Sequence, residues 1–83
     1  INSIQDFYFR NFPFLEALDL SYNNLKILTN FTLSYLTNLK KLFLDNNKII
    51  YIDLNSFLEL GNLEELFFSN NQIEKINKSL FIN

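Results

Sequence analysis

The sequence of 83 residues contains no cysteine and no histidine, and it has only one glycine and one proline. Without cysteine, the chain can form neither a disulfide framework nor a thiolate zinc site. Without histidine, it lacks the commonest general base and the commonest metal ligand, and a Ser-His-Asp triad is excluded. A single glycine argues against a glycine-rich phosphate loop. The sequence therefore predicts a protein that binds rather than catalyses, with no catalytic residues, no metal and no cofactor.

The chain also lacks strong charge and long apolar runs. Its net charge is −2, which gives no basic surface for nucleic acid or for anionic lipid. No apolar run approaches the ~18 residues that a membrane span needs, so this segment is not expected to insert into a membrane. The length allows one domain or part of one, because domains usually have roughly 100–200 residues.

A 24-residue repeat runs through the whole chain. Three segments that start at Leu15, Leu39 and Leu63 read LEALDLSYNNL, LKKLFLDNNKI and LEELFFSNNQI. Counting the other apolar positions in phase with them, 24 positions recur in register and all are apolar, although only 48% of the chain is apolar. The period divides the chain into a partial repeat 1–14, repeats 15–38 and 39–62, and an incomplete repeat 63–83.

These segments resemble the leucine-rich repeat family, in the form L-x-x-L-x-L-x-x-N-x-L of about 24 residues that is found in extracellular proteins such as Toll-like receptors and variable lymphocyte receptors. The resemblance covers the whole chain. It implies an α/β-type solenoid: a right-handed coil with a short-stranded parallel β-sheet on its concave face and a mostly irregular or 3-10 convex side. The chain departs from the family pattern at Leu33 and Phe68, and it lacks the cysteine-rich caps of such ectodomains.

The L-x-x-L-x-L segments predict short strands. In the first, Leu18 and Leu20 point inward and Asp19 points outward, as alternation along a strand requires. Each strand is followed by a return path of about 20 residues, so neighbouring strands should run parallel. Short helical turns are predicted on the return path at Thr32–Leu36 and Ser56–Leu60. Phenylalanines at one repeat position should stack along the wall opposite the sheet: Phe9, Phe57 and Phe81.

Asparagines recur where each predicted strand ends. Asn23, Asn47 and Asn71 occupy the same position of three repeats. Their amides should bond main-chain groups that become free where the chain turns inward, because buried polar groups must be paired. We interpret the three as a structural ladder.

The outward positions of the strands are the candidate ligand-binding residues, since solenoids commonly bind partners on this surface. Phe43 and Phe67 should touch on adjacent strands and both should be exposed, which is typical of residues that anchor interfaces. The alternative is that they only stabilise each other as a cross-strand pair. In-register charges such as Glu16, Lys40 and Glu64 are interpreted as surface ion pairs or as a weak steering field. The predicted binding residues are Asp19, Tyr22, Lys41, Phe43, Asp45, Glu65 and Phe67.

Two sequons bear on the cellular setting. Asn30-Phe31-Thr32 and Asn77-Lys78-Ser79 both fall on the return path, so glycans at Asn30 and Asn77 would leave the strand face free. They favour a secreted protein or the ectodomain of a membrane protein, whereas the absence of cysteine argues the other way. An intracellular location stays open. The apolar ends also lead us to expect a segment of a longer solenoid.

Two classes of function follow from the sequence. The first is a non-catalytic recognition module of a receptor, adhesion or immune-type ectodomain, which binds a macromolecule on its concave face. A protein ligand is expected first, and a glycan or a lipid remains open. The second is an assembly module that self-associates through uncapped solenoid ends. An intracellular leucine-rich-repeat adaptor is a further alternative.

Overall fold

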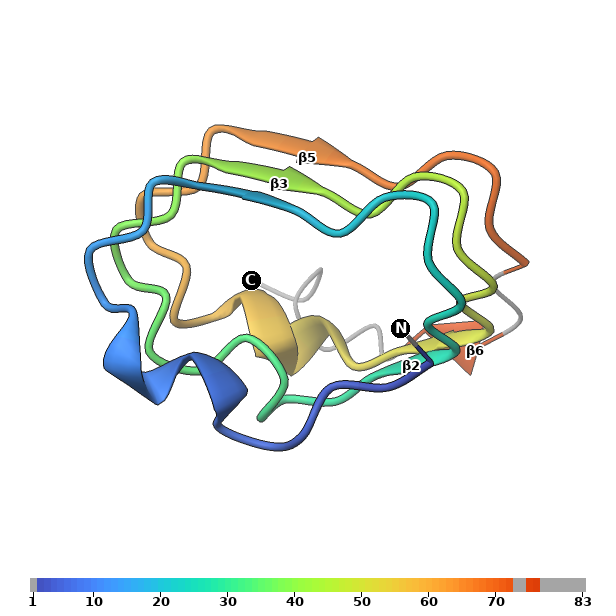
Figure 1. Cartoon of the computed structure of the whole chain (residues 1–83), viewed down its shortest axis with the longest axis horizontal. Helices are drawn as coiled ribbons and strands as arrows, with labels where there is room; N and C mark the ends of the chain where they lie inside the picture. Colours follow the sequence, from blue (N-terminus) through green and yellow to red (C-terminus); the bar gives the residue numbers. More distant parts are fainter. Residues whose placement is uncertain (1, 73–74, 77–83) are drawn as a thin grey trace.

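The structure is a computed structural model, and it describes residues 2–72 and 75–76. Within these residues the chain winds through successive coils, each with one short strand on one side and a second short strand on the other (Figure 1). The elements are η1 (Tyr8–Asn11), β1 (Ala17–Asp19), β2 (Ile27–Leu28), β3 (Lys41–Phe43), β4 (Tyr51–Ile52), η2 (Leu54–Phe57), β5 (Glu65–Phe67) and β6 (Lys75–Ile76), where η marks a 3-10 helix.

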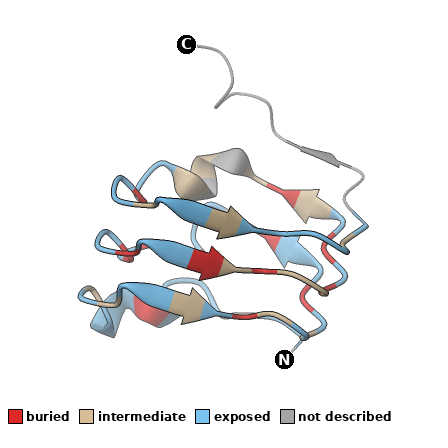
Figure 2. Cartoon of the chain, turned by 90° about the horizontal axis from the view of Figure 1, so that it is seen from above, coloured by how far each residue is buried: buried red, intermediate tan, exposed pale blue. Residues whose placement is uncertain are grey.

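The first sheet is the one that the repeat predicts. Strands β1, β3 and β5 lie side by side and run parallel (Figure 2). Their register follows the 24-residue period, so that Leu18 pairs with Leu42 and Leu42 pairs with Leu66. The predicted parallel pairing and its register are therefore confirmed.

A second parallel sheet, β2-β4-β6, was not predicted from the sequence. It lies across each coil from the first sheet (Figure 1). Ile27 pairs with Tyr51, and Leu28 pairs with Ile52. Leu28 and Ile52 are buried, while Ile27 is exposed and Tyr51 half-buried. These strands have two residues each, and the buried side chain of each pair ties the return path to the core.

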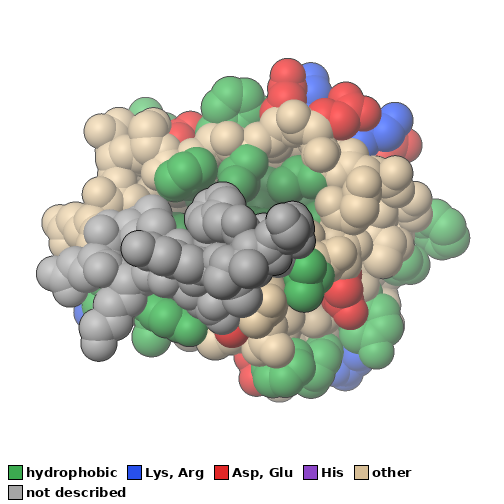
Figure 3. Space-filling view, turned by 180° about the vertical axis from the view of Figure 1, so that it is seen from behind, with side chains coloured by type: hydrophobic (Ala, Val, Ile, Leu, Met, Phe, Trp, Pro, Cys, Tyr) green, Lys and Arg blue, Asp and Glu red, His purple; other side chains and the backbone are tan. Residues whose placement is uncertain are grey.

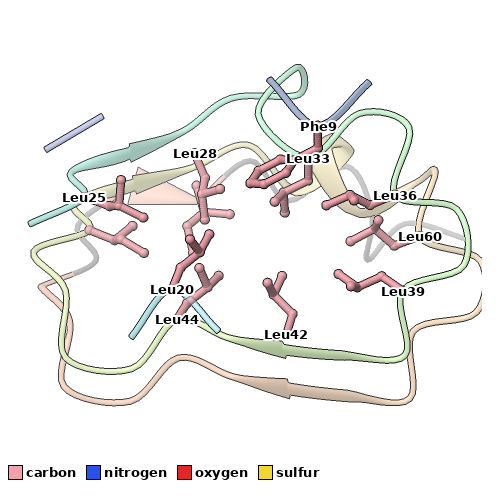
Figure 4. Packing of buried hydrophobic residues seen from close by; sticks show 12 residues of the cluster. Phe9, Leu20, Leu25, Leu28, Leu33, Leu36, Leu39, Leu42, Leu44 and Leu60 are labelled. Carbon is pink, nitrogen blue, oxygen red and sulfur yellow. The ribbon is translucent and has the colours of Figure 1, made fainter. Parts of the chain in front are cut away.

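The space between the two sheets is filled with leucine and isoleucine. Leu42 and Leu44 point inward from the first sheet, and Leu25 and Leu28 meet them from the other side (Figure 4). Burial is most complete in the repeat 39–62, where Leu39, Leu42, Leu44 and Ile49 are fully enclosed. The buried apolar residues are Phe9, Leu20, Leu25, Leu28, Leu33, Leu36, Leu39, Leu42, Leu44, Ile49, Ile52 and Leu60.

The return path differs from the sequence prediction in detail. The second helical turn is the 3-10 helix η2, which lies earlier than the predicted Ser56–Leu60 because the Asp53 carboxylate accepts a hydrogen bond from the Asn55 N–H (3.0 Å) and so caps it there. The predicted turn Thr32–Leu36 is a series of hydrogen-bonded turns over residues 30–35 that does not form a regular helix.

The phenylalanine wall also differs from the prediction. The ring contacts of Phe9 are edge-on with Tyr8 (5.2 Å between ring centroids) and Phe12 (6.5 Å), which both belong to its own coil. Leu33 occupies the repeat position between Phe9 and Phe57 and packs beside Phe9 (Figure 4). An unbroken stack of rings is therefore wrong for this wall, because Leu33 interrupts it. Phe81 lies outside the described residues.

Across residues 2–72 and 75–76, no helix combines the length and the apolar character that crossing a membrane would require.

Candidate ligand-binding face

The outward side chains of β1, β3 and β5, together with the residues that directly follow these strands, form one surface, here called the strand face. Adjacent strands place its residues in rows, because the strands pair without a shift in register. The first row is Ala17, Lys41 and Glu65; the second is Asp19, Phe43 and Phe67; the third is Ser21, Asp45 and Ser69. The predicted binding residues are thus brought together on one surface, with Tyr22 next to the third row.

The rings of Phe43 and Phe67 form the centre of this face. Their centroids are 4.9 Å apart and the ring planes differ by only 5°, so the rings are stacked. Phe67 is exposed, with 40% of its surface accessible, whereas Phe43 is half-buried between Phe67 and Asp19. The sequence predicted that both rings would be exposed, and for Phe43 this is wrong, because it lies on the central strand of the sheet and the Phe67 ring stacks on it.

Two carboxylates on the strand face are held by serine side chains. Asp19 accepts hydrogen bonds from the backbone N–H of Ser21 (2.9 Å) and from its hydroxyl. These two bonds hold the pKa of Asp19 below the ordinary value for aspartate. Asp45 accepts from the backbone N–H (2.7 Å) and the hydroxyl (2.9 Å) of Ser69 in the next coil. Both carboxylates are therefore fixed in direction beside the stacked rings.

Oppositely charged side chains lie near the start of the strands. Lys41 and Glu65 are 3.7 Å apart, and Lys40 and Glu16 are 3.5 Å apart, each measured between nitrogen and oxygen. All four side chains are about half exposed or more, and such surface pairs contribute roughly 0–1 kcal/mol. Charges of both signs gather along this edge (Figure 3), so the edge has no single sign that would attract a strongly charged ligand.

Two asparagines of the predicted ladder, Asn47 and Asn71, bond the main chain of two coils at once. The Asn47 amide nitrogen donates to the carbonyl oxygens of Leu20 (2.9 Å) and Leu44 (3.1 Å), and its oxygen accepts from the Leu25 N–H (3.1 Å). Asn71 repeats these contacts with Leu44, Phe68 and Ile49. Asn23 donates to the Leu20 oxygen (2.9 Å). The amides of these three asparagines therefore stabilise the main chain at the corners, as the sequence analysis interpreted them.

The residue before each ladder asparagine has a left-handed backbone, which the sequence analysis missed. The φ angles are 58° at Tyr22, 59° at Asn46 and 58° at Asn70. Asparagine adopts this conformation readily, but tyrosine does so at a cost of roughly 1–2 kcal/mol. The asparagines at two of the three equivalent positions were the available signal. Tyr22 is thus strained, and 80% of its surface is exposed.

The first sequon lies away from the strand face, as the sequence predicted. Asn30 is exposed at the start of the turns that follow β2. Its neighbours there include the aromatic residues Phe7, Phe31 and Tyr35, which the sequence analysis did not single out. The second sequon residue, Asn77, lies outside the described residues.

The geometry of the described residues offers a surface for contact. Within them, no group of three or more Asp or Glu side chains converges as metal ligands would. Every buried side-chain nitrogen or oxygen that they contain has a hydrogen-bond partner. The features left to act on a partner are the stacked rings, the oriented carboxylates and the strained tyrosine.

Comparison with known protein families identifies the family of the chain. The family model described as leucine rich repeat matches the chain over residues 1–49 and again over residues 37–83, and the two matches together span the sequence. Neither the curated proteins nor the solved structures that were compared contain a significant match.

Proposed function

The chain belongs to the leucine-rich repeat family, and from this premise we propose that it is a non-catalytic recognition module that binds a protein ligand through the strand face. Leucine-rich repeat domains are generally protein-interaction modules and are typically not enzymes. The observation that carries the proposal is the stacked pair Phe43–Phe67, of which Phe67 is open to solvent. Exposed aromatic rings held rigidly beside polar groups are the usual anchors of protein interfaces.

Tyr22 supports the same surface. Strained backbone conformations collect at functional sites, so the strain at this exposed side chain supports a role in binding. Tyr22 follows the end of β1. Its backbone N–H donates to the backbone carbonyl oxygen of Asp45 (3.0 Å), which fixes Tyr22 beside the third row of the strand face. A ligand that covers the Phe43–Phe67 stack would meet Tyr22 at one side.

We further propose that the strand face is the concave side of a right-handed solenoid of the extracellular, 24-residue type. The exposed sequon asparagine Asn30 supports an ectodomain of a receptor or adhesion protein, because it lies off the strand face and a glycan there would leave that face free. A glycan or lipid ligand would fit the stacked rings less specifically than a protein, which could also use the oriented carboxylates Asp19 and Asp45.

Selection from a random-peptide phage library tests the proposed binding face. The immobilised protein would be panned, and the selected clones would then be measured against Phe67→Ala and Leu58→Ala. Both residues are exposed and apolar, but Leu58 follows η2 and lies off the strand face. We expect clone binding to fall at least tenfold with Phe67→Ala and to stay unchanged with Leu58→Ala, since a hot-spot truncation costs about 1.4 kcal/mol or more.

Circular dichroism of both variants shows whether the fold is retained. Equal binding of the clones to the protein and to folded Phe67→Ala would exclude the strand face as the preferred site. Loss of binding with Leu58→Ala alone would move the site to the return path.

Self-association is a second candidate, and one observation favours it. Phe14 is 83% exposed and the neighbouring Phe12 is also exposed, so that an apolar surface lies just before β1. Sedimentation velocity over a dilution series would show an assembly that dissociates, and Phe14→Ser should weaken it. A single monomeric species at all concentrations would contradict this candidate.

A further inference from the structure

A groove of about 630 Å³ lies on the return path, away from the strand face. Its walls include Asn30, Phe31 and Tyr35 from the turns after β2, Phe7 from the preceding coil, and Leu58 after η2. Phe7, Phe31, Tyr35 and Leu58 are all exposed although they are apolar or aromatic. The side chains of Ser34, Asn55 and Glu59 add polar groups to the same walls.

The three rings form a fixed cluster. The Phe7 and Phe31 centroids are 5.0 Å apart, and the Phe7 and Tyr35 centroids are 6.3 Å apart with the rings nearly perpendicular. The backbone holds this arrangement, since the Phe7 N–H donates to the Phe31 oxygen (3.1 Å). The Tyr35 N–H donates to the Glu59 carboxylate of the next coil (3.3 Å).

Two of these aromatic residues have a left-handed backbone. The φ angles are 60° at Phe7 and 76° at Tyr35, which side chains other than glycine, asparagine and aspartate rarely adopt. Residues of this kind collect where function maintains the strain. The strain therefore indicates that the position of the rings around the groove matters.

Asn30 belongs to the wall of this groove and is the first residue of the sequon Asn30-Phe31-Thr32. We propose that the groove holds the first N-acetylglucosamine units of a glycan attached to the Asn30 side chain. The apolar C–H faces of such sugars stack on aromatic rings, and their hydroxyl and acetamido groups bond polar side chains such as the exposed carboxylate of Glu59. The covalent link keeps the sugar at the groove, so a weak stacking interaction is enough to fill it.

The attachment uses an oligosaccharide carried on a lipid diphosphate, which the secretory pathway supplies. The Asn30 amide nitrogen forms a bond to C1 of the first sugar, the bond from C1 to the diphosphate oxygen breaks, and the diphosphate leaves with that electron pair. The amide loses one proton to a base of the transferase. Thr32 is buried, with its hydroxyl oxygen accepting from the Thr29 N–H (3.1 Å), so the transfer must precede folding.

This inference rests on the extracellular setting proposed above, and it does not involve the strand face. The test is to secrete the chain from eukaryotic cells with Asn77→Gln, which leaves Asn30 in the one remaining sequon. Intact mass before and after glycan removal gives the occupancy. The glycan is then trimmed enzymatically to one N-acetylglucosamine, and the chain is compared with the matching Asn30→Gln variant.

Nuclear magnetic resonance of the trimmed sugar reports stacking directly. Ring currents should move its proton resonances upfield from those of the same sugar on the unfolded chain. The trimmed sugar should also raise the melting temperature by roughly 4 °C relative to Asn30→Gln, the size of shift that a modest contact gives in a domain of this length.

Tyr35→Ala should abolish both effects, whereas Tyr8→Ala should keep both because Tyr8 is an exposed tyrosine outside this groove. If Tyr35→Ala does not fold, the upfield shift in the trimmed Asn77→Gln chain still tests whether the sugar stacks on the rings. An unoccupied Asn30, resonances at their unfolded positions, or an unchanged glycan effect in folded Tyr35→Ala would each overturn the proposal. Association of the glycan-free Asn30→Gln chain that is abolished by adding Tyr35→Ala would instead make a second copy the occupant.

Binding of the phage-selected clones to the trimmed protein separates the two proposals. Stacked sugar without clone binding at Phe67 refutes only the proposed function, and clone binding without stacked sugar refutes only the glycan inference.

Discussion

Residues 15–38 form the first full coil and residues 39–62 form the middle coil. In both coils the chain turns away from the first sheet at a corner, but the residues at and before the corner are buried to different extents in the two coils. Leu42 and Asn47 of the middle coil are buried, while their equivalents Leu18 and Asn23 are only half-buried. The described structure places a coil on both sides of the middle corner (Figure 2). The same residue type at the same repeat position should therefore contribute differently to the free energy of unfolding, because the neighbouring coils determine how far it is buried.

The inward-pointing leucines should show the largest difference in stability loss between the two coils. Leu42→Ala should reduce the free energy of unfolding by about 2–5 kcal/mol, because it opens a cavity in a fully enclosed site. Leu18→Ala should cost clearly less, since the Leu18 side chain is only partly buried and already contacts water. Urea denaturation of both variants measures the two values. Equal losses would contradict the unequal burial of the two corners.

The ladder asparagines give a second contrast. Asn47→Ala should cost about 1–3 kcal/mol, because the buried Leu25 N–H and the Leu20 oxygen lose the side chain that bonds them. Asn23→Ala should cost less, because Asn23 is nearer to water, which can replace its bond to the Leu20 oxygen. Amide hydrogen exchange at Leu25 provides a local check, since its protection should fall in Asn47→Ala and persist in Asn23→Ala.

Substitutions at the left-handed residues should affect the two corners in opposite directions, since the first coil should gain stability and the middle coil should lose it. Tyr22→Asn should stabilise the fold by about 1 kcal/mol, because asparagine tolerates a φ of 58° better than tyrosine does. Asn46→Tyr should destabilise the middle corner by a similar amount. Thermal denaturation of the pair is the measurement. A stability loss in Tyr22→Asn would show that the ring makes contacts that outweigh its strain.

The smallest effect concerns the carboxylate of Asp19 in the first coil. Its pKa is lowered in the folded chain by the hydrogen bonds from Ser21, so it contributes stability that is fully present above the ordinary aspartate pKa. That contribution is lost as the pH falls through the lower, folded pKa. Carbon NMR titration should find the pKa of Asp19 below the ordinary value, and Ser21→Ala should raise it. An unchanged titration in Ser21→Ala would exclude these hydrogen bonds as the cause.

The repeat allowed the first sheet and its register to be predicted, because apolar residues at fixed spacing determine which side chains face the core. Leu18, Leu42 and Leu66 are paired as their sequence positions require. The second sheet could not be predicted in this way. Ile27–Leu28 and Tyr51–Ile52 are too short to show the alternation by which a strand is recognised, which needs about 4–8 residues.

The candidate site was predictable as a set of positions but not as a geometry. The alignment of Phe43 with Phe67 followed from the period, whereas the partial burial of Phe43 depends on the sizes of its cross-strand neighbours. The groove beside Asn30 was missed because Phe7 and Tyr35 lie off the repeating apolar positions. Both residues have left-handed backbones, and their N–H groups donate to Phe31 and Glu59, contacts that sequence spacing does not reveal.

Within the part of the chain that the structure describes, the side-chain hydrogen bonds between coils join residues 22 to 27 positions apart, close to the 24-residue period. The separation is 22 residues for Leu25 to Asn47, 24 for Tyr35 to Glu59 and 27 for Asn47 to Leu20. A gene that gains or loses 24 codons in one step would therefore recreate every type of contact with new copies of the same partners. A gain of one codon would misalign partners on both sides of the insertion. Adding or removing whole repeats therefore changes the length of the solenoid without requiring a new fold.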